Sequence, residues 1–414
     1  MIQLKNLIVM ERYNMLVIKK RPVLVLFLAI ILTSVLLRST IVAIGPISEI
    51  VISDLRISSA SFGLITTIPL IVFAFTSALI PFIASKNGLI NTLMGGVVLI
   101  LIGSGLRALG NYNILLFGTI LVGFGISIGN VLIPAIIKDY AGKHRAVFTS
   151  TYLCGQNIFA ALASGVAFFV AIHFSWPFLM GVWIIPAIIA LIFWLYYKSH
   201  GEYKTITKEA SINKFALPIV KELLKSRYAW CITAIMALQS IIYFAQAAWL
   251  PTILDKFNLS PETISFVVIF YQVIAVPGMF LIPIIIKRMK HNSFLLLINS
   301  VFIVSGSIML FFANSFVLIF ISTMLISIGV GVCFAWVVTV ITFVTKNSQQ
   351  ASSLSAMSQT IGYLLAATGP WFGGVLVDIT HTSHSIIVFM FVVCVLIAVI
   401  SIYVYVERAV LSLV

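Results

Sequence analysis

Acidic residues are scarce in this chain, and none of them lies in the middle of a long apolar segment. The sequence holds 11 aspartates and glutamates against 25 lysines and arginines, and all charged residues together make up only 9% of it. Hydrophobic residues make up 61%. Soluble domains carry a much larger charged share, so this composition excludes one and indicates a polytopic membrane protein.

Several chemistries lack the residues that they need. The six histidines stand at or beyond the ends of the apolar segments, so neither histidine nor carboxylate is placed to relay protons across a membrane. The pattern Gly-x-x-x-x-Gly-Lys-Ser/Thr, which binds nucleotide phosphates, is absent. No nucleophile stands in a recognisable pattern with a base. We therefore expect no enzyme activity, no cofactor and no metal. The four cysteines lie in apolar segments and are interpreted as packing residues: Cys154, Cys231, Cys333 and Cys394.

The net charge of +14 could suggest a nucleic-acid partner, but the positions of the basic residues argue against one. They cluster in every second loop and at both chain ends, which is the pattern of cytoplasmic loops in membrane proteins. Only Arg56 and Lys256 fall on the opposite side, and Arg38 and Arg107 fall within apolar segments. The pattern predicts that both termini and the central loop are cytoplasmic, in a multi-pass protein of the plasma or inner membrane.

The apolar segments are about 20–25 residues long and show no alternation of polar and apolar residues, so they predict membrane-spanning helices. Twelve spans are expected, at residues 22–46, 60–84, 89–109, 114–137, 147–172, 177–197, 228–252, 263–286, 293–313, 316–344, 350–376 and 385–407.

The predicted helices divide into two halves of six. Residues 1–197 form the N-terminal half, 198–227 a polar central loop and 228–414 the C-terminal half. The halves echo each other: Arg38 precedes Pro46 as Tyr243 precedes Pro251, and Gln156-Asn157-Ile158 in span 5 resembles Gln359-Thr360-Ile361 in span 11. Chance similarity between apolar helices is the alternative. Two pseudo-symmetric six-helix halves describe the all-α major facilitator fold, whose binding site lies between the halves.

Arg38 is the most informative residue in the chain. A guanidinium near the middle of a bilayer costs about 2.5–3.5 kcal/mol on insertion scales and does not lose its proton. No Asp or Glu lies at a comparable depth in any apolar segment. We interpret Arg38 as a group that faces a polar cavity and binds an anionic substrate. The alternative is an arginine that bonds helix carbonyls or extends to the membrane surface.

Polar side chains near mid-depth should also face the cavity. Amides and phenols can bond a small polar solute without adding charge, although each could instead form an interhelical hydrogen bond, worth about 0.6 kcal/mol on average. The predicted substrate-binding residues are Arg38, Asn130, Gln156, Gln239, Tyr243, Gln359 and Tyr363.

Other residues are given structural roles. Arg107, near the outer end of span 3, is expected to extend its side chain to the membrane surface. Trp176, Trp249 and Trp371 are expected to anchor the outer interface. Gly125 and Gly129 predict a close helix approach, and the Gly369-Pro370 pair predicts a bend.

Motifs in both halves resemble the cyanate/2-nitroimidazole transporter family of the major facilitator superfamily. The stretches that carry the likeness are Leu37-Arg38 with Gly45-Pro46, Gly123-x-Gly125-Ile126 with Gly129-Asn130-Val131-Leu132-x-Pro134, Gln239-Ser240 with Tyr243 and Trp249-Leu250-Pro251, and Leu354-Ser355-Ala356-x-x-Gln359 with Gly362-Tyr363 and Gly369-Pro370. The resemblance implies a carrier of small anions or flat nitrogenous compounds, with Arg38 as the anion-binding group.

Three stretches depart from the pattern of the family or superfamily. Ser39 replaces the usual proline after the arginine, which puts the helix geometry around Arg38 in question. The charged loop motif between spans 2 and 3 is reduced to Ser85-Lys86-Asn87-Gly88. Span 5 has Ala163-Ser164-Gly165 in place of the glycine-proline motif of proton-coupled drug antiporters, which argues against drug efflux.

The sequence thus predicts a functional monomer that carries a small polar, anionic or flat nitrogenous solute through the lipid bilayer by alternating access. One alternative is a multidrug efflux carrier with an aromatic cavity. A more distant alternative is a membrane sensor that does not transport.

Overall fold

The computed structural model describes residues 23–77, 79–141, 144–200, 222–288, 293–345 and 348–407. The regular secondary structure in these ranges is helical throughout. Twelve helical segments are long and apolar enough to cross a membrane, and they confirm the twelve predicted spans. The basic N-terminal residues 1–21 and most of the predicted central loop lie outside the described residues.

The first half starts with helical residues 23–42, which lead into the 3-10 helix η1 (Gly45–Ile47). The other helices of this half are α2 (Ser48–Leu55), α3 (Ser59–Thr76), α4 (Ile80–Asn87), α5 (Leu89–Arg107), α6 (Tyr112–Tyr140), α7 (Arg145–His173), α8 (Trp176–Gly181) and α9 (Ile184–His200).

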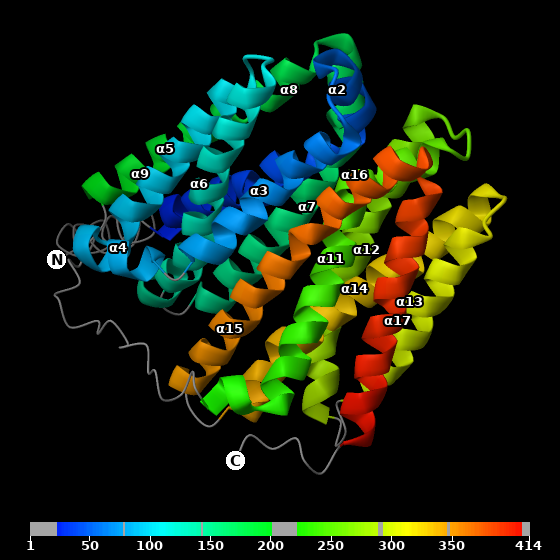
Figure 1. Cartoon of the computed structure of the whole chain (residues 1–414). Helices are drawn as coiled ribbons and strands as arrows, with labels where there is room; N and C mark the ends of the chain where they lie inside the picture. Colours follow the sequence, from blue (N-terminus) through cyan, green and yellow to red (C-terminus); the bar gives the residue numbers. More distant parts are fainter. Residues whose placement is uncertain are drawn as a thin grey trace, which may run out of the picture.

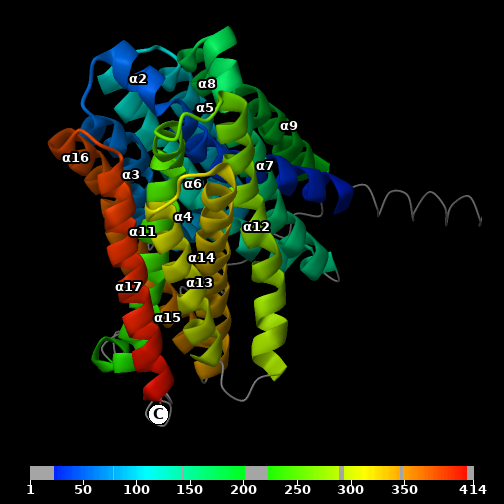
Figure 2. The same cartoon turned by 90° about the vertical axis from the view of Figure 1, so that its right-hand side faces the viewer.

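The second half contains fewer, longer helices, and Figure 2 shows α12, α13, α14 and α17 packed beside one another. The helices of this half are α11 (Arg227–Asp255), α12 (Pro261–Arg288), α13 (Ser293–Phe311), α14 (Phe316–Val344), α15 (Ser348–Ala366), α16 (Thr368–Thr380) and α17 (His384–Val406).

Breaks divide some of the predicted spans into two helices. Span 11 consists of α15 and α16, which meet at Ala367 beside Gly369-Pro370, so a helix boundary lies where a bend was predicted. Span 2 consists of α3 and α4, and Pro81 lies in the first turn of α4. Backbone N–H groups of the first turn have no acceptor within the helix, so proline breaks no hydrogen bond there. The first span extends beyond its predicted end at residue 46, as far as Leu55.

Glycines bring α5 and α6 close together. A Cβ atom on Gly125 would lie 2.3 Å from the Gly96 carbonyl oxygen, and one on Gly103 would lie 2.5 Å from that of Gly118. Larger residues at these positions would push the helices apart. The predicted close approach at Gly125 is therefore confirmed, while Gly129 makes room for the Leu37 side chain on the first helix.

The two halves are bonded to each other at one end of the bundle. We call it the closed end, and it is the end that holds residues 56–58, 256–260 and 381–383. Figure 1 shows α2, α8 and α16 towards this end and α4 towards the other. Hydrogen bonds that join the halves here are Ser48 to Thr252 (2.9 Å), Thr67 to Ala367 (2.8 Å), and Ser59 and Ala60 to Asp378 (2.9 and 2.8 Å).

Two of the three tryptophans expected at the membrane interface are buried instead. Trp249 is 1% exposed, and its indole N–H donates to the Pro370 carbonyl at 2.8 Å. Trp176 is 3% exposed and donates to Asp54 Oδ2 at 2.6 Å. Interface anchoring is therefore wrong for both, because each indole N–H has a protein acceptor. Trp371 is 42% exposed and fits the expectation.

Candidate functional site

The first helix carries Arg38 in its last turns. Other polar side chains of this helix bond back to it: Thr33 Oγ1 donates to the Ala29 carbonyl and Thr40 Oγ1 to the Leu36 carbonyl, both at 2.7 Å. The helix continues through Ser39 as far as residue 42. Serine, unlike proline, keeps its backbone N–H and does not clash with the preceding turn, so the helix is not interrupted beside the arginine.

The Arg38 side chain is half-buried and lies between the two halves. Its Nη1 donates to Asn157 Oδ1 on α7 at 2.6 Å. Its guanidinium carbon lies 4.4 Å from the ring centroid of Tyr243 on α11. Asn157 is 5% exposed and donates in turn to the Leu153 carbonyl at 2.9 Å, which fixes its amide. The arginine is thus held by a neutral amide and an aromatic face.

No carboxylate within the described ranges forms an ion pair with Arg38. An amide oxygen and a π face attract a cation, but they leave its unit charge in place. The region between the halves therefore carries a net positive charge at this depth. Such a charge favours an anion and opposes a cation: at an effective dielectric constant of about 20, a cation about 5 Å away is disfavoured by about 3 kcal/mol.

Aromatic residues of both halves gather near Arg38, and the Tyr243 ring contacts its guanidinium. Tyr243 donates to Gln272 Oε1 at 3.0 Å and stacks on Tyr271 with ring centroids 6.4 Å apart. Tyr363 lies between Phe73 of α3 (4.7 Å) and Phe244 of α11 (6.1 Å). Tyr152, Tyr271 and Tyr363 lie close enough to Arg38 for its charge to act on their hydroxyl groups.

Asn130 and Gln156 form a second polar group in the first half. The Oδ1 atom of Asn130 on α6 accepts from the Tyr152 hydroxyl at 3.0 Å and from Gln156 Nε2 at 3.3 Å. Tyr152 and Gln156 lie one turn apart on α7, and Asn157 follows directly. This group therefore adjoins the asparagine that holds Arg38.

Gln239 and Gln359 bond within their own helices. Gln239 is 3% exposed, and its Nε2 donates to Ser240 Oγ at 2.6 Å and to the Met236 carbonyl at 3.1 Å. Gln359 Nε2 donates to Ser355 Oγ at 2.9 Å. The structure therefore groups Arg38 with Tyr243 and Tyr363, and it does not bring these two glutamines into that group.

The seven residues selected from the sequence omit several neighbours of Arg38. Asn157, Tyr271 and Gln272 are polar residues of the predicted spans. Their contacts with Arg38 or Tyr243 depend on how each helix is rotated, which the sequence does not show. Tyr152 could have been found from its spacing, because it lies four residues before Gln156 and so shares its helix face.

Arg107 corrects an expectation. It is 1% exposed and does not extend to the membrane surface. Its Nη1 donates to the Thr40 carbonyl at 2.8 Å and its Nη2 contacts Met180 Sδ at 3.0 Å. The Thr40 carbonyl is one of the last in its helix, and no backbone N–H of the helix donates to it. The guanidinium supplies the missing donor, and its positive charge interacts favourably with the helix dipole.

We expect Arg107→Gln to lower the free energy of unfolding by about 1–3 kcal/mol, because a shorter side chain leaves the buried Thr40 carbonyl without a donor. Thermal unfolding of purified protein in detergent measures this loss. Arg56→Gln is the control, because Arg56 is exposed at the same end of the bundle. Equal melting temperatures for the two variants would contradict a helix-capping role for Arg107.

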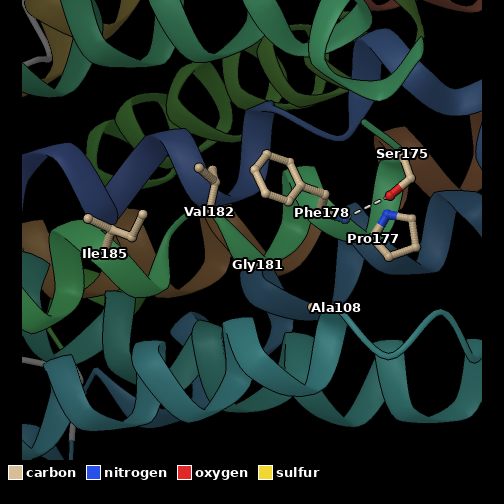
Figure 3. Close-up of a pocket in the computed structure, with 7 residues that line it drawn as sticks. All are labelled: Ala108, Ser175, Pro177, Phe178, Gly181, Val182 and Ile185. Carbon is tan, nitrogen blue, oxygen red and sulfur yellow. Dashed lines mark hydrogen bonds between the residues drawn. The ribbon is translucent and has the colours of Figure 1, made fainter. Parts of the chain in front are cut away.

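A pocket of about 390 Å³ lies at the closed end of the first half (Figure 3). Its lining is apolar except for Ser175, whose hydroxyl already accepts from the Phe178 N–H at 3.3 Å. None of the seven predicted residues lines it, so it is not the site described above. The lining residues are Ala108, Ser175, Pro177, Phe178, Gly181, Val182 and Ile185.

Comparison with known proteins identifies the family. Residues 23–367 match the Major Facilitator Superfamily. The chain belongs to this superfamily. Its members are transporters and not enzymes, so this chain is a multi-pass secondary transporter that binds a small-molecule substrate within the membrane.

Three curated relatives align with most of the chain. The uncharacterized transporter YycB of Bacillus subtilis (strain 168) is 35% identical over 349 residues, 84% of this chain and 85% of the relative. The 2-nitroimidazole transporter of Escherichia coli (strain K12) is 28% identical and covers 84% and 86%. The cyanate transport protein CynX of the same strain is 20% identical and covers 86% and 90%. The resemblance drawn from the motifs is thus confirmed at the level of the family.

Solved structures confirm the major facilitator fold. A bacterial homologue of the human lysosomal transporter Spinster, in an inward-facing and unoccupied conformation, superposes with a TM-score of 0.74 at 14% identity. The match covers 95% of this chain and 97% of that one.

Proposed function

We propose that this transporter carries a small polar solute, either an anion or a flat nitrogenous compound, between the halves by alternating access. The observation that carries the proposal is the contact set of Arg38, which is bonded to Asn157 (2.6 Å) and lies over Tyr243 (4.4 Å). Both partners are neutral, so the guanidinium retains a charge that an anion can neutralise.

The aromatic rings around Arg38 support the second part of the proposal. A flat, electron-poor ring can stack on tyrosine or phenylalanine while its polar substituents bond to the guanidinium. Tyr243, Tyr363, Phe244 and Phe73 provide such faces. Relatives named as transporters of 2-nitroimidazole and of cyanate are consistent with both solute types.

The proposed alternating-access cycle uses no cofactor and no metal. It also does not couple transport to proton movement through a side chain in the middle of the membrane. Uniport, exchange, or co-transport in which the substrate itself carries the proton fits this set of titratable residues. We place the chain in the plasma or inner membrane as a functional monomer. The distribution of its basic residues favours cytoplasmic termini. In this orientation the closed end faces outward. We also propose that residues 198–227 form the loop that separates the two halves.

A ligand screen by thermal unfolding tests the substrate class. A ligand that binds the folded protein stabilises it by mass action, by about 2.7 kcal/mol at one hundred times its dissociation constant. We expect cyanate or other small anions, or nitroimidazoles, to raise the melting temperature, and lipophilic cations to leave it unchanged. Uptake of the stabilising ligand into proteoliposomes then distinguishes a carrier from a sensor. Stabilisation by cations alone would contradict the proposal and favour an efflux carrier.

A further inference from the structure

The carboxylate of Asp378 caps a helix that belongs to the other half of the protein. Asp378 lies near the end of α16, and its two oxygens accept from the backbone N–H groups of Ser59 (2.9 Å) and Ala60 (2.8 Å), the first two residues of α3. The first backbone N–H groups of a helix have no acceptor within it. Two of these groups of α3 therefore depend on a residue more than three hundred positions away in the chain.

The packing between α3 and α16 holds Asp378 in register with these two N–H groups. A Cβ atom on Gly374 would lie 2.4 Å from the Ser59 carbonyl oxygen, and one on Gly63 would lie 2.6 Å from that of Pro370. Further along, Thr67 Oγ1 donates to the Ala367 carbonyl at 2.8 Å. Contacts thus recur at each turn along the two helices, which lie side by side (Figure 1).

The rest of the α3 terminus is capped within its own half. Ser58 Oγ accepts from the Ser61 N–H at 3.1 Å, so this bond does not require α16. The bonds to Asp378 are different, because they exist only while the two halves meet at the closed end. Alternating access requires the halves to separate at that end during each cycle.

We propose that Asp378 is a latch of the closed end: it stabilises the conformation seen here relative to one in which this end is open. The charge of the carboxylate suits this role, because a helix N-terminus attracts an anion. When the end opens, water must replace the carboxylate at Ser59 and Ala60. This inference rests on the alternating-access part of the proposed function, and it is independent of what Arg38 binds.

The test measures the separation of the halves without any ligand. Spin labels are attached to cysteines introduced at Ser53 of α2 and Glu262 of α12, both exposed at the closed end, after the four native cysteines are replaced. In Asp378→Ala, the equilibrium should shift toward the open end by about two- to thirty-fold, the range expected for losing a helix cap. Double electron–electron resonance should then show a longer-distance population. Asp378→Asn retains one acceptor oxygen, and it should shift the equilibrium less.

Asn111→Ala is the matched control. Asn111 Oδ1 accepts from the N–H groups of Asn113 and Ile114 at the start of α6, so the variant also removes two helix-capping bonds, but within one half. It should lower the melting temperature and leave the distance distribution unchanged. If Asp378→Asn and Asp378→Ala also lower only the melting temperature, Asp378 is a helix cap without a latch function and the inference is wrong. Should Asp378→Ala fail to fold, Asp378→Asn alone decides the matter. A failed ligand screen would not alter either result.

Discussion

Arg38→Gln should abolish most transport of an anionic substrate while the protein still folds. Hydrogen bonds to a charged group contribute about 1.5–3 kcal/mol, so losing the guanidinium should weaken anion binding by about 10- to 150-fold. Folding should survive because glutamine still offers an amide N–H to Asn157, and because the variant removes a charge that has no counter-ion among the described residues. Initial uptake rates in proteoliposomes and the ligand-induced rise in melting temperature measure the two effects separately.

Two further variants make this prediction specific. Arg38→Lys keeps the charge but loses the planar guanidinium that stacks on Tyr243 and can bind an anion through two N–H groups, so it should restore binding only in part. Arg107→Gln also removes an arginine from the membrane-spanning part of the first half. It should lower stability but leave the affinity of the folded protein unchanged. Full anion uptake by Arg38→Gln would rule out a binding role for Arg38.

Gly45→Ala should stop the transport cycle by preventing the closed end from closing. Gly45 lies in η1, and a Cβ atom there would stand 2.0 Å from the Ala247 carbonyl oxygen of α11. Real Cβ atoms essentially never come within 3.0 Å of another heavy atom, and the obstacle is backbone, which cannot rotate away. The halves must therefore remain apart at this point. We expect net uptake to be lost and the distance between labels at Ser53 and Glu262 to be long.

Gly95→Ala is the control for this variant. Apart from the neighbouring backbone of α5 itself, no atom lies within 4 Å of a Cβ atom built on Gly95, a residue inside α5. Alanine should be tolerated there, and it should stabilise the helix by about 0.5–1 kcal/mol. Uptake at the normal rate by Gly45→Ala would show that η1 and α11 can separate without cost to the cycle, and would remove Gly45 from the closing contacts.

The sequence was a good guide to the helices and a poor guide to side-chain partners. Long apolar segments predict membrane helices because a bilayer offers no hydrogen bonds to the backbone, and this holds whatever the helices later contact. Side-chain roles depend on how each helix is rotated. Gln239 and Gln359 carry the same amide group as Gln156 and Gln272, yet their amides bond within their own helices. Helix rotation also explains why Arg107 and Trp249 are buried and do not lie at the membrane interface as expected, because the sequence does not show which helices pack against them.

Composition and hydropathy alone determined that this protein is an all-helical membrane protein with twelve spans, because burial of the backbone in lipid leaves few alternatives. They also singled out Arg38, because a charge at that depth is costly wherever the helix points. Only the tertiary structure decided what surrounds it. The partners Asn157 and Tyr243 come from helices far apart in the chain, and the contact of Asp378 with the start of α3 joins opposite halves. Contacts of this kind follow from the packing of whole helices, and no local pattern of residues encodes them.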